Sequence, residues 1–265
     1  RDAKISIVPD CGMGPGMNIS MALLAMEQFE DPQEIFIYDG GLPQNPTPPW
    51  NYNLFFNIEG LTNEYDGDAF FIRNGKVTEV PCFEGLETIQ FSDRFPELEA
   101  AVTSGGLSTM PWTYEGKLKT LENKTLRYLG HWNEMKAYRQ LGLFRQDTVK
   151  FNGLDIAPRD FYHHLLEDHL NQGQVEDVCL MKVIGKGLID GVEKRVEIQT
   201  EEYHDSKLNL SAMEKWTGWH ASIVALNILN GTIQAGATAI ENALPGSLFL
   251  KEAQKRHYSI DIVTF

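Results

Sequence analysis

The sequence predicts an α+β fold, in which helices cover a mixed, largely antiparallel sheet. More segments have a strand pattern than a helical one. Several strands are joined by short turns, which connect antiparallel neighbours because a parallel pair needs a long crossover. After the first strand, helix and second strand, the chain enters a segment with prolines at 43, 46, 48 and 49. A doubly wound parallel sheet would continue there with another helical crossover.

The first half of the chain contains two helical patterns among strand and turn signals. Apolar residues at helical spacing follow a glycine-rich loop, which predicts an amphipathic helix. Asn74-Gly75 between two β-rich runs is a strong hairpin signal, and Gly142 ends the second helical pattern. In order, we predict a strand at 4–8, a helix at 17–29, a strand at 34–38, a hairpin at 70–81, strands at 98–103 and 119–129, and a helix at 130–141.

The second half of the chain predicts a long hairpin and further helices. Residues 178–184 and 192–203 alternate on either side of glycine-containing turns. Pro158 suits the first position of a helix, where a backbone N–H would be unpaired anyway. Residues 219–229 are apolar all round, as in a buried helix. The remaining predictions are a short strand after Asp147, helices at 158–170 and 248–255, a turn at Pro245-Gly246 and a strand at 260–263.

Composition and charge exclude several classes of protein. The 265-residue chain has a formal net charge of −14, so we expect neither nucleic acid nor an anionic membrane as a partner. Its three cysteines have neither disulfide nor zinc spacing and favour the cytoplasm. No apolar run approaches the roughly 18 residues of a membrane span, and the start has no signal-peptide pattern. The chain opens abruptly on a strand, as expected of part of a longer protein.

The opening segment KISIVPDCGMGPG allows three interpretations. A strand, a glycine loop, a helix and a second strand ending in Asp39 imitate a dinucleotide-binding unit. However, Met17 replaces the third glycine of that fingerprint, and Pro15 removes an amide donor that a pyrophosphate would need. The second interpretation is a tight turn without a ligand. The third is a loop that receives the polar end of a small substrate.

Six motifs in order resemble the saccharopine dehydrogenase family. The form of the first motif, which contains Asp10, is more similar to the lysine 6-dehydrogenase branch of that family than to the fungal saccharopine reductases. The resemblance covers residues 5–145 and returns more weakly at 213–218. The motifs are VPDCGMGPG at 8–16, GGLP at 40–43, NGK at 74–76 with VP at 80–81, TSGGL at 103–107, KTLRYLGH at 124–131 and LGL at 141–143.

The resemblance implies a fold, a cofactor and a substrate class. Residues 1–265 would form the C-terminal substrate-binding and dimerisation domain, similar in fold to the C-terminal domain of glyceraldehyde-3-phosphate dehydrogenase. The Rossmann domain would be absent, with residues 215–265 extending toward it. NAD or NADP would bind mainly to that absent domain, so this chain by itself would be inactive. The parent would be a cytoplasmic, homodimeric oxidoreductase that acts on a C–N bond of lysine or a lysine derivative. The alternative is a non-catalytic ligand-binding or dimerisation module.

Candidate site residues follow from the same motifs. By resemblance, Arg127 binds a substrate carboxylate, a task that suits a bidentate guanidinium, and Tyr128 lies beside it. Asp10 holds the substrate ammonium, and His131 or Lys124 accepts a proton. Cys11, Gly12 and Gly41 are expected near the substrate because they lie in or beside the glycine motifs.

Each candidate also has a structural explanation. Asp10 could be a helix N-terminal carboxylate, and Arg127 an ordinary surface ion pair. His131 and Lys124 could both be structural. His131 would open a helix, whose dipole would lower its pKa. The histidines at 163, 164 and 169 lack a common face, which indicates a solvated helix and no metal site.

Overall fold

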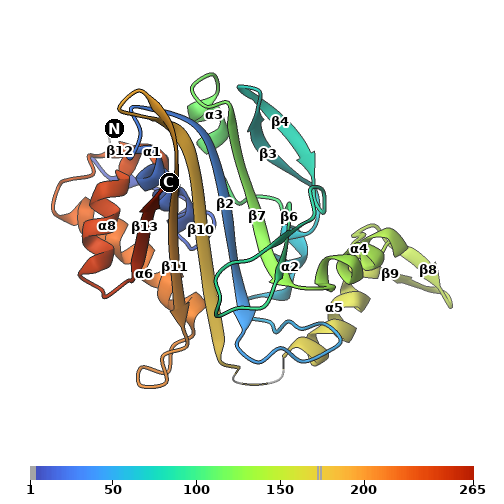
Figure 1. Ribbon diagram of the computed structural model, residues 1–265. Helices are drawn as coiled ribbons and strands as arrows, with labels where there is room; N and C mark the ends of the chain where they lie inside the picture. Colours follow the sequence, from blue (N-terminus) through green and yellow to red (C-terminus); the bar gives the residue numbers. More distant parts are fainter. Residues whose placement is uncertain (1–3, 172, 174) are drawn as a thin grey trace.

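A twisted nine-stranded sheet forms the centre of the computed structural model, which describes residues 4–171, 173 and 175–265 (Figure 1). Its main strand order is β13-β11-β10-β2-β7-β3-β4, and β6 pairs with both β5 and β7. Within this described sheet only β2 and β7 pair in parallel. The strands are β2 (Asp31–Pro43), β3 (Asp68–Arg73), β4 (Lys76–Pro81), β5 (Glu87–Ile89), β6 (Leu98–Ala101), β7 (Thr120–Tyr128), β10 (Asp177–Ile189), β11 (Val192–Tyr203) and β13 (Ile260–Thr264).

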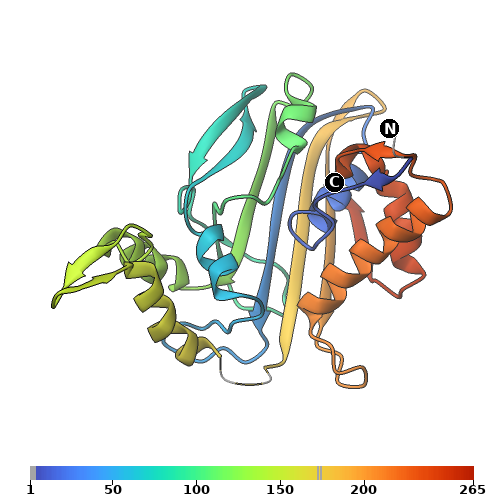
Figure 2. The same cartoon turned by 180° about the vertical axis from the view of Figure 1, so that it is seen from behind.

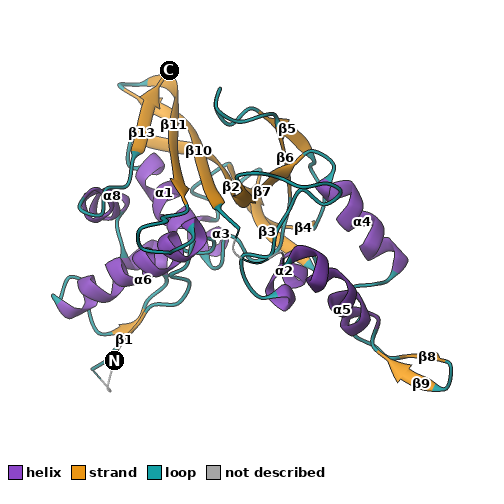
Figure 3. Cartoon of the chain, turned by 90° about the horizontal axis from the view of Figure 1, so that it is seen from below, coloured by secondary structure: helices purple, strands orange, loops and turns teal. Residues whose placement is uncertain are grey.

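Two groups of helices lie on one side of this sheet (Figures 2 and 3). One group lies beside β10, β11 and β13, and the other lies near β7 and carries a small projecting hairpin. The first group is α1 (Met17–Met26), α6 (Ala212–Leu229), α7 (Ile240–Ala243) and α8 (Gly246–Gln254). The second is α2 (Ile58–Glu64), α4 (His131–Leu141) and α5 (Pro158–Leu170), with the hairpin β8 (Val149–Phe151) and β9 (Leu154–Ile156). The short elements α3 (Met110–Tyr114), β1 (Ser6–Ile7) and β12 (Gly236–Ala237) complete the described chain.

The predicted fold class and both predicted hairpins are confirmed. The first strand differs, because β1 has two residues and pairs with β12 outside the central sheet. The helix predicted at 219–229 begins earlier, at a capping box formed by Ser211 and Glu214. It is not buried all round, since Leu226 is 47% and Leu229 82% exposed. Sequence reasoning missed the short elements α2, α3, α7, β5, β9 and β12.

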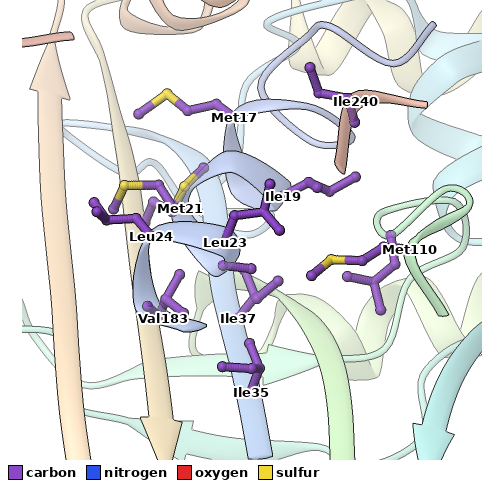
Figure 4. Close-up of a cluster of buried hydrophobic side chains, with 14 of the residues drawn as sticks. Met17, Ile19, Met21, Leu23, Leu24, Ile35, Ile37, Met110, Val183 and Ile240 are labelled. Atoms are coloured by element: carbon purple, nitrogen blue, oxygen red, sulfur yellow. The ribbon is translucent and has the colours of Figure 1, made fainter. Parts of the chain in front are cut away.

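Helix α1 forms the centre of the main core (Figure 4). It packs on Ile35, Ile37 and Val183 of the sheet, and every residue from Met17 to Ala25 is buried. The predicted amphipathic character is therefore wrong, because the sheet covers one side of the helix and α6, α7 and α8 cover the others. The part of the chain that the structure describes contains no helix with the length and apolar character of a membrane span.

The buried His220 ties α6 to α1 and to the opening loop. Its Nε2 lies 3.0 Å from Ser20 Oγ, and its Nδ1 lies 2.9 Å from Cys11 O. Because the carbonyl can only accept, Nδ1 carries the proton and Nε2 accepts from Ser20. Burial lowers the pKa of His220 to about 4, so the ring is neutral at pH 7.

Replacing His220 by glutamine tests this linkage through pH. A lowered folded-state pKa gives stability that is present above the unfolded pKa and is lost as the pH falls toward 4. The variant should be less stable than wild type at pH 7, and the gap should narrow by about 2 kcal/mol at pH 5. Urea unfolding at both pH values measures it, with the exposed His164→Gln as control. A gap that stays constant with pH would contradict the assignment.

Candidate substrate site

A cavity of roughly 620 Å³ lies on the helical side of the sheet, with residues of β2 and β7 as its floor. Its walls come from the loop 12–15 before α1, from α2, from the loop 103–106 and from the first turns of α6. It therefore lies between the two helical groups, where segments distant in sequence meet (Figure 3). A volume of this size suits a small molecule.

Side-chain alternation along β7 decides which residues reach this cavity. Asn123, Thr125 and Arg127 all line it, because every second residue of a strand points to the same face. On the neighbouring strand β2 the same alternation brings Asp39 and Gly41 to the cavity. The predicted placement of Arg127 and Gly41 at one site agrees with this geometry.

Lys124 and Tyr128 lie on the opposite face of β7. Lys124 Nζ lies 2.6 Å from Glu87 Oε1, and Tyr128 Oη donates to Pro43 O at 2.9 Å. Neither residue lines the cavity. This geometry does not support Lys124 as a proton acceptor or Tyr128 as a substrate contact, because both positions are out of phase with Arg127.

Arg127 presents a buried guanidinium to the cavity, with 3% of the residue exposed. Its Nε donates to Tyr65 Oη at 3.0 Å and its Nη1 to Leu126 O at 2.9 Å, while its Cζ lies 4.7 Å from the ring centroid of Tyr52. Burial by itself would lower the pKa of Arg127. Tyr65, Tyr52 and Glu64 raise this pKa by more than burial lowers it, so the guanidinium stays charged. The alternative of a surface ion pair does not fit this burial.

His131 acts on the cavity indirectly, by a hydrogen bond to Tyr65 and a ring contact with Tyr52, whose centroid lies 5.2 Å away. Tyr65 Oη accepts from Arg127 and lies 2.9 Å from His131 Nε2. His131 Nδ1 lies 3.4 Å from Trp50 O, which can only accept, so Nδ1 carries the proton and Nε2 accepts from Tyr65. Burial, followed by the charge of Arg127, lowers the pKa of His131 to about 3. His131 is absent from the cavity lining, and its Nε2 is already occupied. It begins α4 as predicted, but this geometry does not support a proton acceptor at His131 and instead places the ring where it can hold Tyr65.

Asp39 is a buried carboxylate of the cavity floor. Its Oδ1 accepts from Asn123 Nδ2 at 2.6 Å, and its Oδ2 lies where a Cβ on Gly14 would come within 2.6 Å. Burial raises the pKa of Asp39 to about 6, although Asn123 and Arg127 oppose this. Sequence reasoning considered Asp39 only as a ribose ligand. Asp39 lies two residues before Gly41, and along a strand this spacing predicts that both residues point to the same face.

Glu64, at the end of α2, is a site residue that sequence reasoning missed. Its Oε2 lies 3.9 Å from Arg127 Nη2, and 34% of its side chain is exposed. Burial of the carboxyl group in the cavity wall raises the pKa of Glu64 to about 7; Arg127 lowers it and Asp39 raises it further. The Asn57 cap of α2 was visible in the sequence, but its position against β7 was not.

Asp10 also lines the cavity, and its carboxylate accepts a hydrogen bond from Ser108 Oγ. Gly12 lines the cavity as well. Cys11 is outside the lining: its Sγ donates to Val8 O at 3.2 Å, and burial and then Asp10 raise its pKa. The structure does not support the predicted placement of Cys11 at the substrate, because its side chain turns back onto its own loop.

The glycine loop does not fit a dinucleotide pyrophosphate. The amide of Gly16 donates to Asn18 Oδ1, and those of Met17 and Asn18 donate to carbonyls of the same loop. These are the donors that a phosphate would need at the start of α1. Because these amides already have partners, Asp10 does not cap α1. Of the three interpretations, the cavity supports the loop that faces a small substrate.

The histidines of α5 lie in different environments. His163 is buried, 2.7 Å from Thr62 Oγ1 and 3.2 Å from Glu59, whereas the ring of His169 lies 4.8 Å from that of Trp50. The expected solvated face is therefore wrong for His163. Within residues 4–171, 173 and 175–265, no three His, Cys, Asp or Glu side chains are grouped so that they could hold a metal ion.

The fold and site define a class: an α+β domain whose cavity is lined by one guanidinium and three carboxylates. The sequence matches the family described as Saccharopine dehydrogenase C-terminal domain over residues 12–257. The chain therefore belongs to this family of oxidoreductase domains, and the predicted family is confirmed.

Two solved structures share the fold. Apo histidine-tagged saccharopine dehydrogenase (L-Glu forming) from Saccharomyces cerevisiae has a TM-score of 0.79 at 16% identity, over 100% of this chain and 75% of that chain. Homospermidine synthase from Legionella pneumophila, in complex with NAD, has a TM-score of 0.55 at 9% identity, over 99% of this chain and 64% of that chain. At these identities the likeness concerns the fold.

Proposed function

We propose that this chain is the substrate-binding domain of an NAD(P)-dependent oxidoreductase that acts on a CH–NH or CH–NH2 group of lysine or a lysine derivative. The observation that carries the proposal is the charge pattern of the cavity. Arg127 lines the same cavity as Asp10, Asp39 and Glu64. A ligand that bears a carboxylate and ammonium groups complements this arrangement, and lysine has one carboxylate and two ammonium groups.

The residues of this chain would bind and orient such a ligand. Arg127 would hold its carboxylate, since the chain through Tyr65 and His131 fixes the guanidinium plane. Asp10 and Asp39 would hold the ammonium groups. Removal of hydride from a carbon beside nitrogen requires a deprotonated amine, and Asp39, with a pKa of about 6, is the better proton acceptor than either residue expected from the sequence.

The dinucleotide belongs on a separate nucleotide domain in this proposal. The amides of Gly16, Met17 and Asn18 at the start of α1 are already bound within the loop, and the family includes oxidoreductases. We further propose a homodimer and a cytoplasmic location, in keeping with three free cysteines. The rival function is a non-catalytic ligand-binding or dimerisation module with the same cavity. A polyamine is a second candidate ligand, because the three carboxylates also suit a diamine and homospermidine synthase shares the fold.

Calorimetric titration of this chain with lysine, saccharopine and cadaverine tests the proposal. We expect lysine to bind, and cadaverine to bind more weakly because it leaves Arg127 without an anion. Absence of heat with every ligand at millimolar concentration would contradict an amino-acid or amine site. Binding of cadaverine alone would favour the polyamine function instead.

A further inference from the structure

Glu64 and Arg127 face each other across the cavity without forming a hydrogen bond. Their closest charged atoms, Glu64 Oε2 and Arg127 Nη2, lie 3.9 Å apart, beyond hydrogen-bond length. Nε and Nη1 of Arg127 are already bound to Tyr65 and Leu126. Nη2 makes no hydrogen bond to a described residue, so it is a donor that a ligand carboxylate can reach, and such a ligand would lie next to Glu64.

We propose that Glu64 takes up a proton from solvent when a ligand carboxylate binds Arg127, and that its protonated carboxyl group then donates a hydrogen bond to that carboxylate. The inference rests on the proposed function, since it assumes a ligand with a carboxylate. Two adjacent carboxylates cannot both stay ionised at low cost, so either the ligand is excluded or Glu64 is neutralised. Neutral Glu64 supplies a donor where ionised Glu64 offers only acceptors.

The surroundings of Glu64 favour this proton uptake. Glu64 is the last residue of α2, where the partial negative charge of the helix end disfavours a carboxylate. Asp39 on β2 adds like charge, Arg127 on β7 opposes it, and Asp10 lines the same cavity from the opening loop. The hydroxyls of Tyr52 and Tyr65 complete the titratable groups around it. With a pKa of about 7, the Glu64 carboxylate can take up a proton near neutral pH.

Proton uptake by Glu64 makes the affinity of the cavity depend on pH only for ligands that have a carboxylate. Above pH 7 the dissociation constant of lysine should rise about tenfold per pH unit, because the ionised form of Glu64 must first be protonated. Cadaverine has no carboxylate and can bind beside ionised Glu64. Glu64 is therefore a specificity-determining residue that favours amino acids over diamines as the pH falls.

Titration calorimetry in two buffers of different ionisation enthalpy measures the proton directly. At pH 8 we expect lysine binding to take up close to one proton, and cadaverine binding to take up none. Glu64→Gln should bind lysine at pH 8 about tenfold more tightly than wild type and without proton uptake. Glu59→Gln is the matched control, because Glu59 is an exposed glutamate of the same helix outside the cavity lining and should behave as wild type.

The outcomes separate the two proposals. Lysine binding at pH 8 without proton uptake would overturn the role of Glu64 and leave the proposed function standing. Loss of lysine binding in a folded Glu64→Gln variant would show that Glu64 holds an ammonium group, and would also overturn the inference. Absence of heat with every ligand, in wild type and variants alike, would contradict the proposed function itself.

Discussion

Replacing Arg127 by methionine should weaken lysine binding about 100-fold. A hydrogen bond to a charged group contributes about 1.5–3 kcal/mol, and 1.4 kcal/mol corresponds to a factor of ten in affinity. Methionine keeps an apolar side chain against the rings of Tyr52 and Tyr65 but removes all donors. Arg127→Lys should lose about tenfold, because an ammonium on a flexible stem is not held in place by Tyr65 and Leu126 as the guanidinium is. Calorimetric titration with lysine measures both effects.

Two controls show whether the loss concerns the ligand carboxylate. Cadaverine should bind Arg127→Met at least as well as wild type, since a repulsive cation has been removed. Arg73→Met makes the same chemical change at an arginine that binds Glu122 outside the cavity and should leave lysine binding unchanged. Thermal unfolding confirms that each variant is folded. Unchanged lysine affinity in a folded Arg127→Met would rule out the assignment of the carboxylate to this residue.

Local signals were sufficient to predict most of the fold. The Asn74-Gly75 turn joins β3 to β4, and Gly142 ends α4 in a left-handed conformation (φ 90°), as its lack of a side chain allows. The 12 residue pairs of β10 and β11 repeat the alternation seen in the sequence. Helices of four to seven residues, such as α2 and α7, were missed because they are too short to show a period.

The site was only partly predictable, and some errors were avoidable. Two-residue alternation in the strand 120–128 places Asn123 with Arg127 and excludes Lys124 and Tyr128. The sequence alone was therefore sufficient to place Lys124 and Tyr128 on the opposite face of this strand from Arg127. By contrast, Glu64 meets Arg127 through tertiary packing of α2 against β7, and no local pattern records a contact over that separation.

The opening segment resembles a dinucleotide-binding unit because both need glycines where a helix packs closely on a sheet. Gly14 allows Asp39 to approach the loop, and Gly16 has a φ of 139°, which a side chain would strain. The polar atoms of Asn18 and Ser20 are bound internally, which allows α1 to be buried on all sides. The glycines therefore serve packing, and the chemistry of the cavity comes from Asp10, Asp39 and the residues of β7.

Gly246→Ala should cause the largest loss of stability, about 3 kcal/mol in unfolding free energy. A Cβ at this position would lie 2.2 Å from Leu24 N and 2.4 Å from Leu24 Cα. Both are backbone atoms of α1, so no flexible side chain can yield. The two amides of Gly246 and Ser247 also donate to Glu27 at 2.7 Å, and a shift of α8 would weaken both bonds. Urea unfolding at pH 7 measures the effect.

The matched control is Gly218→Ala in α6, where a Cβ would meet no atom within 4 Å. Alanine has a higher helix propensity than glycine by about 1 kcal/mol, so this variant should be unchanged or slightly more stable. The same propensity would favour alanine at Gly246, at the start of α8, so propensity and packing predict opposite signs there. A destabilised Gly246→Ala beside a neutral Gly218→Ala identifies the close approach of α8 to α1 as the cause. Equal stability of the two variants would show that α1 can move within the core, contrary to its burial on every side.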